Sequence, residues 1–413
     1  MTSSRSVRRV AAVGLVTVLA TGSASSGQGT FNDLGPSLYA SGASENGELV
    51  VGTSPTEYFY WTEATGLVMV GGTAAGNGVG GQAKVSNDGS RMVGTVFNPI
   101  SGLYEMGICL LDEVATWVPL GGIGSSSGSE TSSGWGISGD GSTAVGLGWI
   151  SAGGAHAIRS VDLAPPVDLG STVTGRSTRA NGCDEDGSVV VGWQDSKTGF
   201  RQGAVWVDGV QTLITLASSG SMLGEASGCS ADGTWAVGNG VSSNGWNAWR
   251  WSSATGGVNI ASPPTPGWRG ASVAISADGN TIVGFYRPFP GPASFGRGFI
   301  WTAEGGQQDL TDLAIASGIE IPTGVTLALP LGISADGSTV VGQGRGPSGT
   351  FGFRVQFAVE CPADLSGDGT VGGEDLTILL AAWGTTNPKV DLTGDGTVGG
   401  DDLAVLLAAW GGC

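Results

Sequence analysis

The chain of 413 residues contains 17 Lys and Arg against 35 Asp and Glu, which gives a formal net charge of −18. This acidic balance argues against binding to the phosphates of nucleic acids or to anionic membranes. Its 77 glycines occur with 14 Trp and 40% apolar residues, enough to build a core, so we interpret the glycines as turns between many short strands.

Residues 1–27 are predicted to be an export signal. Arg5, Arg8 and Arg9 precede an apolar run from Val10 to Ala20, and small residues follow at 22–24. That run is too short to cross a bilayer, and no later run reaches the roughly 18 residues that a membrane helix needs. We therefore expect a secreted, extracellular protein without membrane insertion, held to a cell surface, if at all, through its C-terminal segment.

Residues 28–359 contain seven copies of one pattern, Ser-x-Asp-Gly followed by an apolar run that ends in Val-Gly. An Asp-Gly pair between two apolar runs is a strong signal for a β-hairpin. The first copy has Glu-Asn-Gly and the fourth begins with Asp184 in place of Ser. The turn glycines are Gly47, Gly89, Gly141, Gly187, Gly233, Gly279 and Gly337.

Each copy continues with an aromatic strand, as at 59–61 and 299–301, and a short strand that ends near Leu-Gly. Four strands in a unit of about 46 residues predict a blade of a β-propeller. The fold class is therefore all-β, a seven-bladed β-propeller, or one of six or eight blades if a weak unit is misread. The segment 31–35 is predicted to be the closing strand of the last unit, which stops after residue 357 without one.

The pattern S-x-D-G-x-x-V-V-G, followed by [AF]-x-x-W and L-G strands, resembles the HAF-repeat family of extracellular bacterial proteins. The resemblance covers nearly all of the body. It implies export and repetition, and it transfers no catalytic residue.

Residues able to perform acid–base chemistry are scarce in the body. His156 is the single histidine and is interpreted as a strand residue, and neither G-x-S-x-G nor H-E-x-x-H occurs. The match to G-x-G-x-x-G at 76–81 does not open a helix and is interpreted as a loop. The aspartates of the turns are interpreted as turn-forming, although acids from different blades could meet at the mouth of the ring for glycoside cleavage. These aspartates are Asp88, Asp140, Asp186, Asp232, Asp278 and Asp336.

Aromatic residues near turns suggest a carbohydrate ligand or, more simply, contacts between blades. They are Trp135, Trp149, Trp193, Trp246 and Trp268. Three or more carboxylates with a Tyr or Arg at one mouth of the ring would favour an enzyme, and a glycine-lined mouth would favour a binding module.

The segment 360–413 contains a 27-residue unit written twice, and each copy has the spacing of an EF-hand calcium loop. Oxygen-bearing side chains stand at loop positions 1, 3, 5 and 12, with glycine at position 6, where a sharp turn brings them around one ion. The first predicted calcium ion takes Asp364, Ser366, Asp368, Asp375 and the carbonyl of Thr370. The second takes Asp391, Thr393, Asp395, Asp402 and the carbonyl of Thr397.

Each loop is followed by a predicted helix with one apolar stripe, over 376–383 and 403–410, and the two stripes are expected to bury each other. Paired loops of this form, each followed by one helix, resemble a dockerin, the calcium-dependent plug that docks into cohesin modules. The closing Gly-Cys with Cys361 resembles the tails of GC-type dockerins. The resemblance implies a cohesin-like partner, or another surface protein, that binds through residues 361–413.

Five cysteines in an exported chain favour disulfides. Cys361 and Cys413 bracket the tail and are predicted to pair. Cys183 and Cys229 either pair or serve as small core residues, and Cys109 is expected to be buried and free. The function predicted from the sequence is a non-catalytic binding or structural propeller tethered by its tail, and the alternative is a tethered carbohydrate-active hydrolase or lyase.

Overall fold

The computed structural model describes residues 29–75, 79–112, 114–151, 153–358, 361–368 and 370–411. The chain divides into two compact units, of which one spans residues 28–358 and the other contains residues 359–413. The predicted export signal, residues 1–27, lies outside the described residues. Within them, no helix has the length and apolarity needed to span a membrane.

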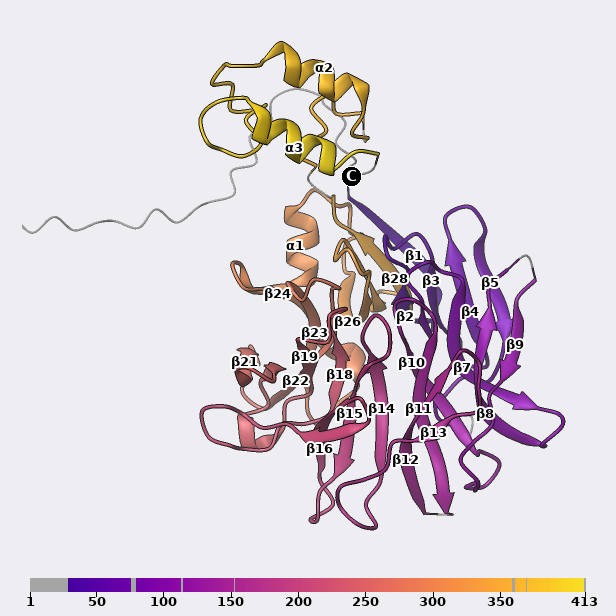
Figure 1. The fold of residues 1–413 in the computed structure, drawn as a ribbon. Coiled ribbons are helices and arrows are strands. Elements are labelled where there is room, and N and C mark those ends of the chain that lie inside the picture. The colour runs from indigo at the N-terminus through magenta and orange to yellow at the C-terminus, as the bar shows by residue number, and fades with distance from the viewer. Residues whose placement is uncertain are drawn as a thin grey trace, which may run out of the picture. The chain divides into compact units, whose positions relative to one another are not determined.

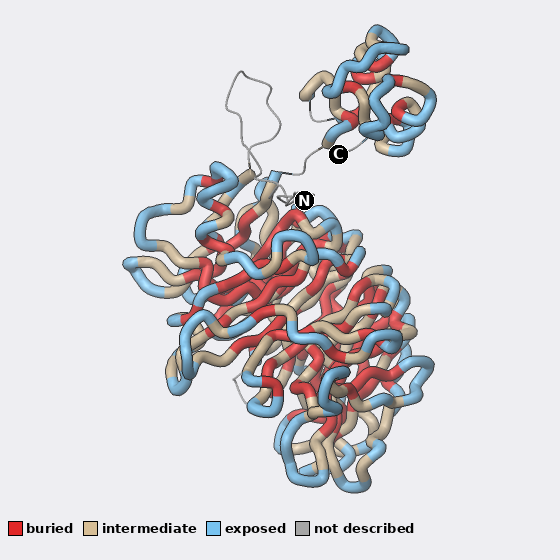
Figure 2. The backbone as a smooth tube through the Cα atoms, turned by 90° about the vertical axis from the view of Figure 1, so that its left-hand side faces the viewer, coloured by how far each residue is buried: buried red, intermediate tan, exposed pale blue. Residues whose placement is uncertain are grey.

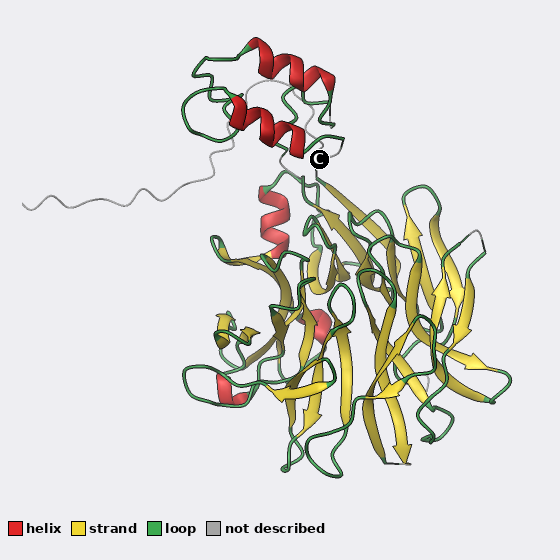
Figure 3. Cartoon of the chain, viewed as in Figure 1, coloured by secondary structure: helices red, strands yellow, loops and turns green. Residues whose placement is uncertain are grey.

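The larger unit is a seven-bladed β-propeller, as predicted, with four antiparallel strands in each blade (Figures 1 and 3). The first two blades contain β2 (Tyr39–Ala43), β3 (Val50–Thr53), β4 (Tyr58–Thr62) and β5 (Gly66–Gly71), then β6 (Lys84–Val85), β7 (Arg91–Asn98), β8 (Leu103–Leu110) and β9 (Thr116–Pro119). The third and fourth contain β10 (Ser132–Ile137), β11 (Thr143–Ser151), β12 (Gly154–Val161) and β13 (Val167–Asp168), then β14 (Thr178–Cys183), β15 (Val189–Asp195), β16 (Arg201–Val207) and β17 (Val210–Leu213). The fifth and sixth contain β18 (Ala226–Cys229), β19 (Ala236–Gly238), β20 (Ala248–Ser252) and β21 (Gly256–Ala261), then β22 (Trp268–Ile275), β23 (Thr281–Pro288), β24 (Arg297–Thr302) and β25 (Gly306–Asp309).

The seventh blade is completed by the N-terminal end of the propeller. Its strands β26 (Thr326–Ile333), β27 (Thr339–Gly346) and β28 (Gly349–Gln356) are followed by β1 (Thr30–Pro36), which pairs antiparallel with β28 so that Phe31 lies opposite Val355. The predicted closing strand at 31–35 is therefore confirmed. This pairing joins the two ends of the propeller and covers the edge that β28 would otherwise expose.

The turn between the first and second strand of a blade shows why the Ser-x-Asp-Gly pattern recurs. In the fifth blade, Ser230 Oγ donates to Asp232 Oδ1 at 2.6 Å and accepts from the backbone N–H of Trp235 at 3.0 Å. Asp232 Oδ1 also accepts from the N–H of Thr234 at 2.9 Å, and these hydrogen bonds lower the pKa of the Asp232 carboxyl. The following glycine has φ between 66° and 78° in all seven turns, a left-handed conformation that favours glycine. The end of the ring that carries these turns is called the Asp-Gly end below.

A circle of backbone hydrogen bonds joins the seven turns at the Asp-Gly end. At each junction an N–H of one turn donates to a carbonyl of the next, with distances between 2.8 and 3.0 Å. The donors are Glu45, Asn87, Asp140, Glu185, Ala231, Ala277 and Asp336, and the last of them donates to the carbonyl of Glu45. The blades are thus joined by main-chain bonds that do not depend on side-chain identity.

The hydrophobic core lies in the interfaces between neighbouring blades, where the buried residues follow the strands and the exposed ones lie in the connecting loops (Figure 2). The aromatic strands supply large buried rings, among them Phe59, Trp206, Trp249, Phe299 and Phe353. One helix inside the propeller was not predicted. It is α1 (Leu310–Ala316), whose N-terminus is capped by Asp309 through the N–H groups of Thr311 and Asp312. Two short 3-10 turns, Ser242–Asn244 and Ala293–Phe295, complete the elements of the propeller.

The smaller unit contains two helices, α2 (Gly373–Ala381) and α3 (Gly400–Ala408), which begin three residues before the predicted ranges and end two residues before them. Each loop is bonded to the end of the opposite helix. The carbonyl of Val371 accepts from the N–H of Gly411, and Val398 exchanges backbone hydrogen bonds with Gly384 and Thr385. The two halves of the repeat therefore form one structure with approximate two-fold symmetry.

Candidate functional site

The two predicted calcium loops have nearly the same hydrogen bonds. Asp364 Oδ1 accepts from the N–H groups of Gly367 and Asp368 at 2.7 and 3.1 Å. In the second loop, Asp391 Oδ1 accepts from Gly394 and Asp395 at 2.8 and 3.2 Å. The carboxylate at position 1 thus gathers the first turn of each loop around itself.

The carboxylate at position 12 ties the end of each loop to its beginning. Asp375 accepts from Ser366 N–H at 2.8 Å and from Gly372 N–H at 2.6 Å. Asp402 accepts from Thr393 N–H at 3.0 Å and from Gly399 N–H at 2.6 Å, and these bonds lower the pKa of the Asp402 carboxyl. Both residues are buried, in the first turns of α2 and α3. Each pair of bonds holds a carboxylate at the mouth of its loop.

The remaining predicted ligands lie on the same loops. Asp368 Oδ1 accepts from the N–H of Thr370 and Asp395 Oδ1 from that of Thr397, both at 2.8 Å. Gly396, at position 6, has a φ of 93°, whereas Gly369 lies outside the described residues. Among the described residues, no group of three or more Asp, Glu, His or Cys side chains converges closely enough to hold a metal ion. The donors are those that calcium prefers, and calcium binding stays a prediction.

The apolar stripes of α2 and α3 are only partly buried, so the expectation that they cover each other needs correction. Leu379 and Leu406 are fully buried, because Val371 and Val398 from the loops fill the space beside them. In contrast, four residues are about half exposed, with values of 48% to 52%. They are Leu380 and Trp383 beside α2 and Leu407 and Trp410 beside α3. The unit therefore presents the same Leu–Trp pair twice.

The cysteines fall into two groups. Cys109, Cys183 and Cys229 are free thiols, and burial raises the pKa of Cys109 to about 12. Cys183 and Cys229 occupy corresponding positions in neighbouring first strands beside the ring's axis, which fits their interpretation as small packed residues. Cys413 lies outside the described residues, and its pairing with Cys361 stays a prediction.

A small cavity of about 150 Å³ lies on the axis of the propeller and is lined by the first strands of all seven blades. Five blades place a glycine at the corresponding position. A Cβ on Gly136 would lie 2.7 Å from the Cα of Gly182, so close approach of the blades requires glycine there. The second blade has Lys84 instead, whose Nζ donates to the carbonyls of Ser41 and Leu331 at 2.6 and 3.0 Å. The axis is thus glycine-lined and narrow, with one amine that links three blades.

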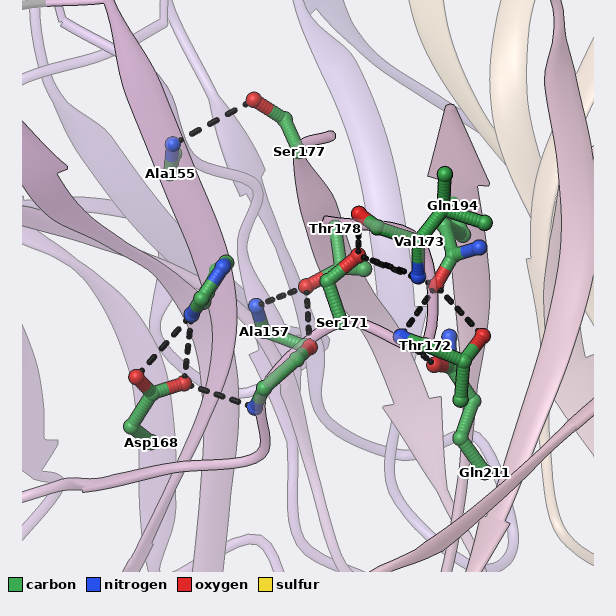
Figure 4. A network of polar contacts seen from close by, with 12 residues as sticks. Ala155, Ala157, Asp168, Ser171, Thr172, Val173, Ser177, Thr178, Gln194 and Gln211 are labelled. Atoms are coloured by element: carbon green, nitrogen blue, oxygen red, sulfur yellow. Dashed lines mark hydrogen bonds and ion pairs between the residues drawn. The ribbon is translucent and has the colours of Figure 1, made fainter. Parts of the chain in front are cut away.

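His156 forms a pair with Asp168, its Nδ1 lying 2.9 Å from both carboxylate oxygens. Figure 4 shows Asp168 in this network, together with the neighbouring hydroxyls. Ser177 Oγ accepts from the N–H of Ala155 at 3.3 Å, and Thr178 Oγ1 from that of Ala157 at 2.8 Å. Among the described residues, the His156 ring is hydrogen-bonded to Asp168 and to no Ser, Thr or Cys side chain, so no hydrogen-bonded nucleophile–base pair is formed at this histidine.

Arginine side chains cover several of the tryptophans that were considered for stacking on sugars. The guanidinium of Arg179 lies 3.7 Å from the ring centre of Trp135, and that of Arg201 lies 4.2 Å from Trp193. Arg269 lies 3.9 Å from Trp246. Trp149 donates its Nε1–H to Glu130 at 2.9 Å. These four tryptophans contact side chains of the protein itself, which favours their interpretation as packing residues over stacking on a sugar.

A larger cavity, of about 610 Å³, lies at the Asp-Gly end beside the first blade and was missed by sequence reasoning. Its walls include Trp61 and the carboxylates of Glu45, Glu48, Glu63 and Asp88. The available signal was the departure of the first repeat from Ser-x-Asp-Gly, since two of these glutamates stand at positions where most other repeats have small polar residues or alanine.

The chain is similar to known proteins in its fold alone. No family model and no curated protein matches this chain. An oligogalacturonate lyase in complex with manganese gives a TM-score of 0.50 at 11% identity, over 80% of this chain and 93% of the lyase chain. The β-propeller domain of the Trilobed protease from Pyrococcus furiosus gives 0.49 at 10%, over 78% and 97%. TolB from Acinetobacter baumannii gives 0.43 at 14%, over 65% of this chain and 61% of TolB.

Proposed function

We propose that this protein is an exported, non-catalytic binding propeller that attaches to a cell surface or an extracellular assembly through a calcium-dependent C-terminal module. The chain repeats a calcium-type loop twice with the same carboxylate-to-amide bonds in both copies. Calcium would be held by Asp364, Ser366, Asp368, Asp375 and the Thr370 carbonyl, and by their counterparts from Asp391 to Asp402. A bound ion supplies a fixed link between loop and helix.

The observation that supports attachment most directly is the half-exposed Leu–Trp pair on each half of the tail unit. Apolar residues of this size, repeated on a small unit, are typical of surfaces that a partner covers. The dockerin-like pattern indicates a cohesin-like module or another surface protein as that partner. The poverty of acid–base groups in the propeller, with a single histidine that is hydrogen-bonded to no Ser, Thr or Cys side chain of the described residues, supports a binding role over catalysis.

A pull-down from secreted and envelope fractions tests this proposal. The bait is the full chain, measured in calcium and again in chelator, beside a variant that ends after Ala358. We expect a partner that is retained by the full chain in calcium only and is lost with Trp383→Ala/Trp410→Ala. Retention by the truncated variant, or retention in chelator, would contradict attachment through the tail.

A carbohydrate-active enzyme is the second candidate, and the cavity at the Asp-Gly end is the observation in its favour, because it contains four carboxylates and an arginine. A binding role fits the cavity better than catalysis, because the guanidinium of Arg354 is already hydrogen-bonded to the protein. Its guanidinium donates to the Gly47 carbonyl at 2.8 Å, to Asn32 at 3.1 Å and to Gln356 at 2.7 Å. Release of reducing or unsaturated sugar ends from a panel of polysaccharides, abolished by Glu63→Gln, would establish the enzyme instead.

A further inference from the structure

The cavity at the Asp-Gly end has the size of a site for a small ligand. Its volume of about 610 Å³ falls in the range of known ligand pockets. The turn residues 44–49 and the segment 61–64 of the first blade form most of its wall, and the second and seventh blades contribute 87–89 and Arg354. The Trp61 side chain, half-buried against the first blade, supplies an aromatic surface within that wall.

Negative charge in this cavity is only partly compensated, because four carboxylates are present with one arginine, Arg354, whose charge interacts with those of Glu63 and Glu48. Asp88 is satisfied by Ser86 and Ser90, and Arg354 by the acceptors named above. Among the described residues, the carboxylates of Glu45, Glu48 and Glu63 accept no hydrogen bond and form no ion pair. Three carboxylates that face one cavity raise the local concentration of cations there.

The first repeat gives up a local hydrogen bond to place one of these acids. In other turns, the residue after the glycine caps the turn aspartate, as Ser90 does with Asp88 and Thr234 with Asp232, at 2.7 and 2.6 Å. In the first turn the aspartate is replaced by Asn46 and the capping residue by Glu48. A position that departs from its repeat and loses a stabilising bond is a mark of a functional site.

The arrangement fits an organic cation with more than one positive group. Glu45 and Glu48 lie in the turn between β2 and β3 and Glu63 in the turn between β4 and β5, so the charges suit a ligand whose positive groups are spaced apart. An indole face binds ammonium groups and also the C–H face of a sugar. The guanidinium of Arg354 lies 5.8 Å from the centre of the Trp61 ring, which shows that a cation can approach this ring.

We propose that this cavity binds an organic ligand with two or more ammonium groups, which the glutamates pair with while Trp61 covers its carbon skeleton. A free polyamine and an oligomer of glucosamine share this chemistry. The inference gives a ligand class to the proposed binding role of the propeller. Its test uses no docking partner, so failure of attachment and failure of ligand binding are read separately.

Isothermal titration of the full chain with spermidine and with glucosamine tetramer tests the inference, with N-acetylglucosamine tetramer as the uncharged control. We expect saturable binding of at least one amine, weaker at higher ionic strength, and none of the acetylated control. The amine that binds identifies the source. Glu48→Gln/Glu63→Gln should weaken binding by about tenfold. Glu304 lies outside the cavity, in the turn of the sixth blade that corresponds to the turn of Glu63 in the first. Glu304→Gln should therefore leave the affinity for the amine unchanged.

Two results would overturn the inference. One is the absence of saturable binding for both amines. The other is equal affinity of the wild type and Glu48→Gln/Glu63→Gln, or equal binding of the acetylated tetramer. The substituted side chains are exposed, so matching thermal unfolding of the variants confirms that folding is unaffected.

Discussion

At the scale of the residue, the serine that begins six of the seven turns organises the hydrogen bonds around it. Ser230 is fully buried, and its hydroxyl serves Asp232 and the backbone of Trp235 at once. Its removal leaves the part-buried N–H of Trp235 without this acceptor, and the cost of such a group is set by desolvation as well as by the lost bond.

Ser230→Ala is therefore expected to lower the free energy of unfolding by about 1 to 3 kcal/mol. Thr234→Ala is the matched control, because it removes an exposed bond to the same aspartate and should cost no more than about 1 kcal/mol. Urea unfolding followed by tryptophan fluorescence measures both. Equal losses of unfolding free energy in the two variants would show that the burial of Ser230 does not add to the cost of removing its hydroxyl.

Lys84 adds a pH dependence at the axis of the ring. Burial lowers the pKa of Lys84 from its ordinary value of 10.5 to about 8. Below pH 8 the amine is protonated in both the folded and the unfolded chain, and burying its charge opposes folding. Between pH 8 and 10.5 the folded chain has lost the proton that the unfolded chain keeps, so this group's contribution to stability rises with pH.

As the pH increases from 7 to 10, the free energy of unfolding of the wild type is expected to rise relative to that of the Lys84→Met variant. The gain over this range is about 2.5 kcal/mol, because folding lowers the pKa of Lys84 from 10.5 to about 8. Melting temperatures of the two proteins, recorded across this range, provide the comparison. A constant difference between them would mean that Lys84 is charged in the folded protein throughout.

The candidate site shows what residue patterns could and could not predict. Calcium loops could be proposed from the sequence because their predicted ligands lie within 12 consecutive residues, and calcium binding there stays a prediction. The cavity was not visible, since Glu48, Asp88 and Arg354 come from three blades. Likewise, the exposure of Trp383 and Trp410 depends on how far the loop valines fill the space between the helices.

At the scale of the element, β1 is the strand on which closure of the ring depends. It pairs with β28 over its whole length, and Arg354 on β28 reaches Asn32 on β1 at 3.1 Å. This strand could be predicted because the last repeat lacks an outer strand and the first is preceded by one. The helix α1 could not, because it occurs once and no repeat reveals it.

Deletion of residues 29–36 is expected to leave β28 as an exposed edge and to cause association between chains. The seventh blade loses one quarter of its strands, so we also expect an earlier and broader thermal transition. Size-exclusion chromatography and calorimetry measure the two effects. A monomer with unchanged unfolding would show that the other six junctions suffice.

Calcium should act on the smaller unit alone. At a concentration about 100 times the dissociation constant, binding to one site adds about 2.7 kcal/mol to the stability of the unit that holds it. Calorimetry of the full chain should therefore show one transition that moves upward with calcium and downward with chelator. The variant that ends after Ala358 should show only a transition that calcium does not move.

At the scale of the whole molecule, the propeller follows from seven copies of one unit. The period predicted the number of blades, and the order of strands followed from hairpins within each copy. What the period could not predict is how the copies differ at their junctions. Arg91, Arg159 and Arg354 donate to the carbonyl of the turn glycine of the next blade at 3.1, 3.2 and 2.8 Å, whereas the other four junctions of the described residues have no such arginine bond.

The circle of hydrogen bonds at the Asp-Gly end has one consequence for how the protein can change over evolution. Each of the seven hydrogen bonds runs from one turn to the next in the same direction, and the seventh returns to the first turn, so the series is closed. Loss of one repeat would require all the remaining blades to change the angle between neighbours together. Substitutions within a turn, by contrast, leave these backbone hydrogen bonds intact. Such a scaffold resists changes in blade number while each turn stays open to new side chains, as the first turn illustrates.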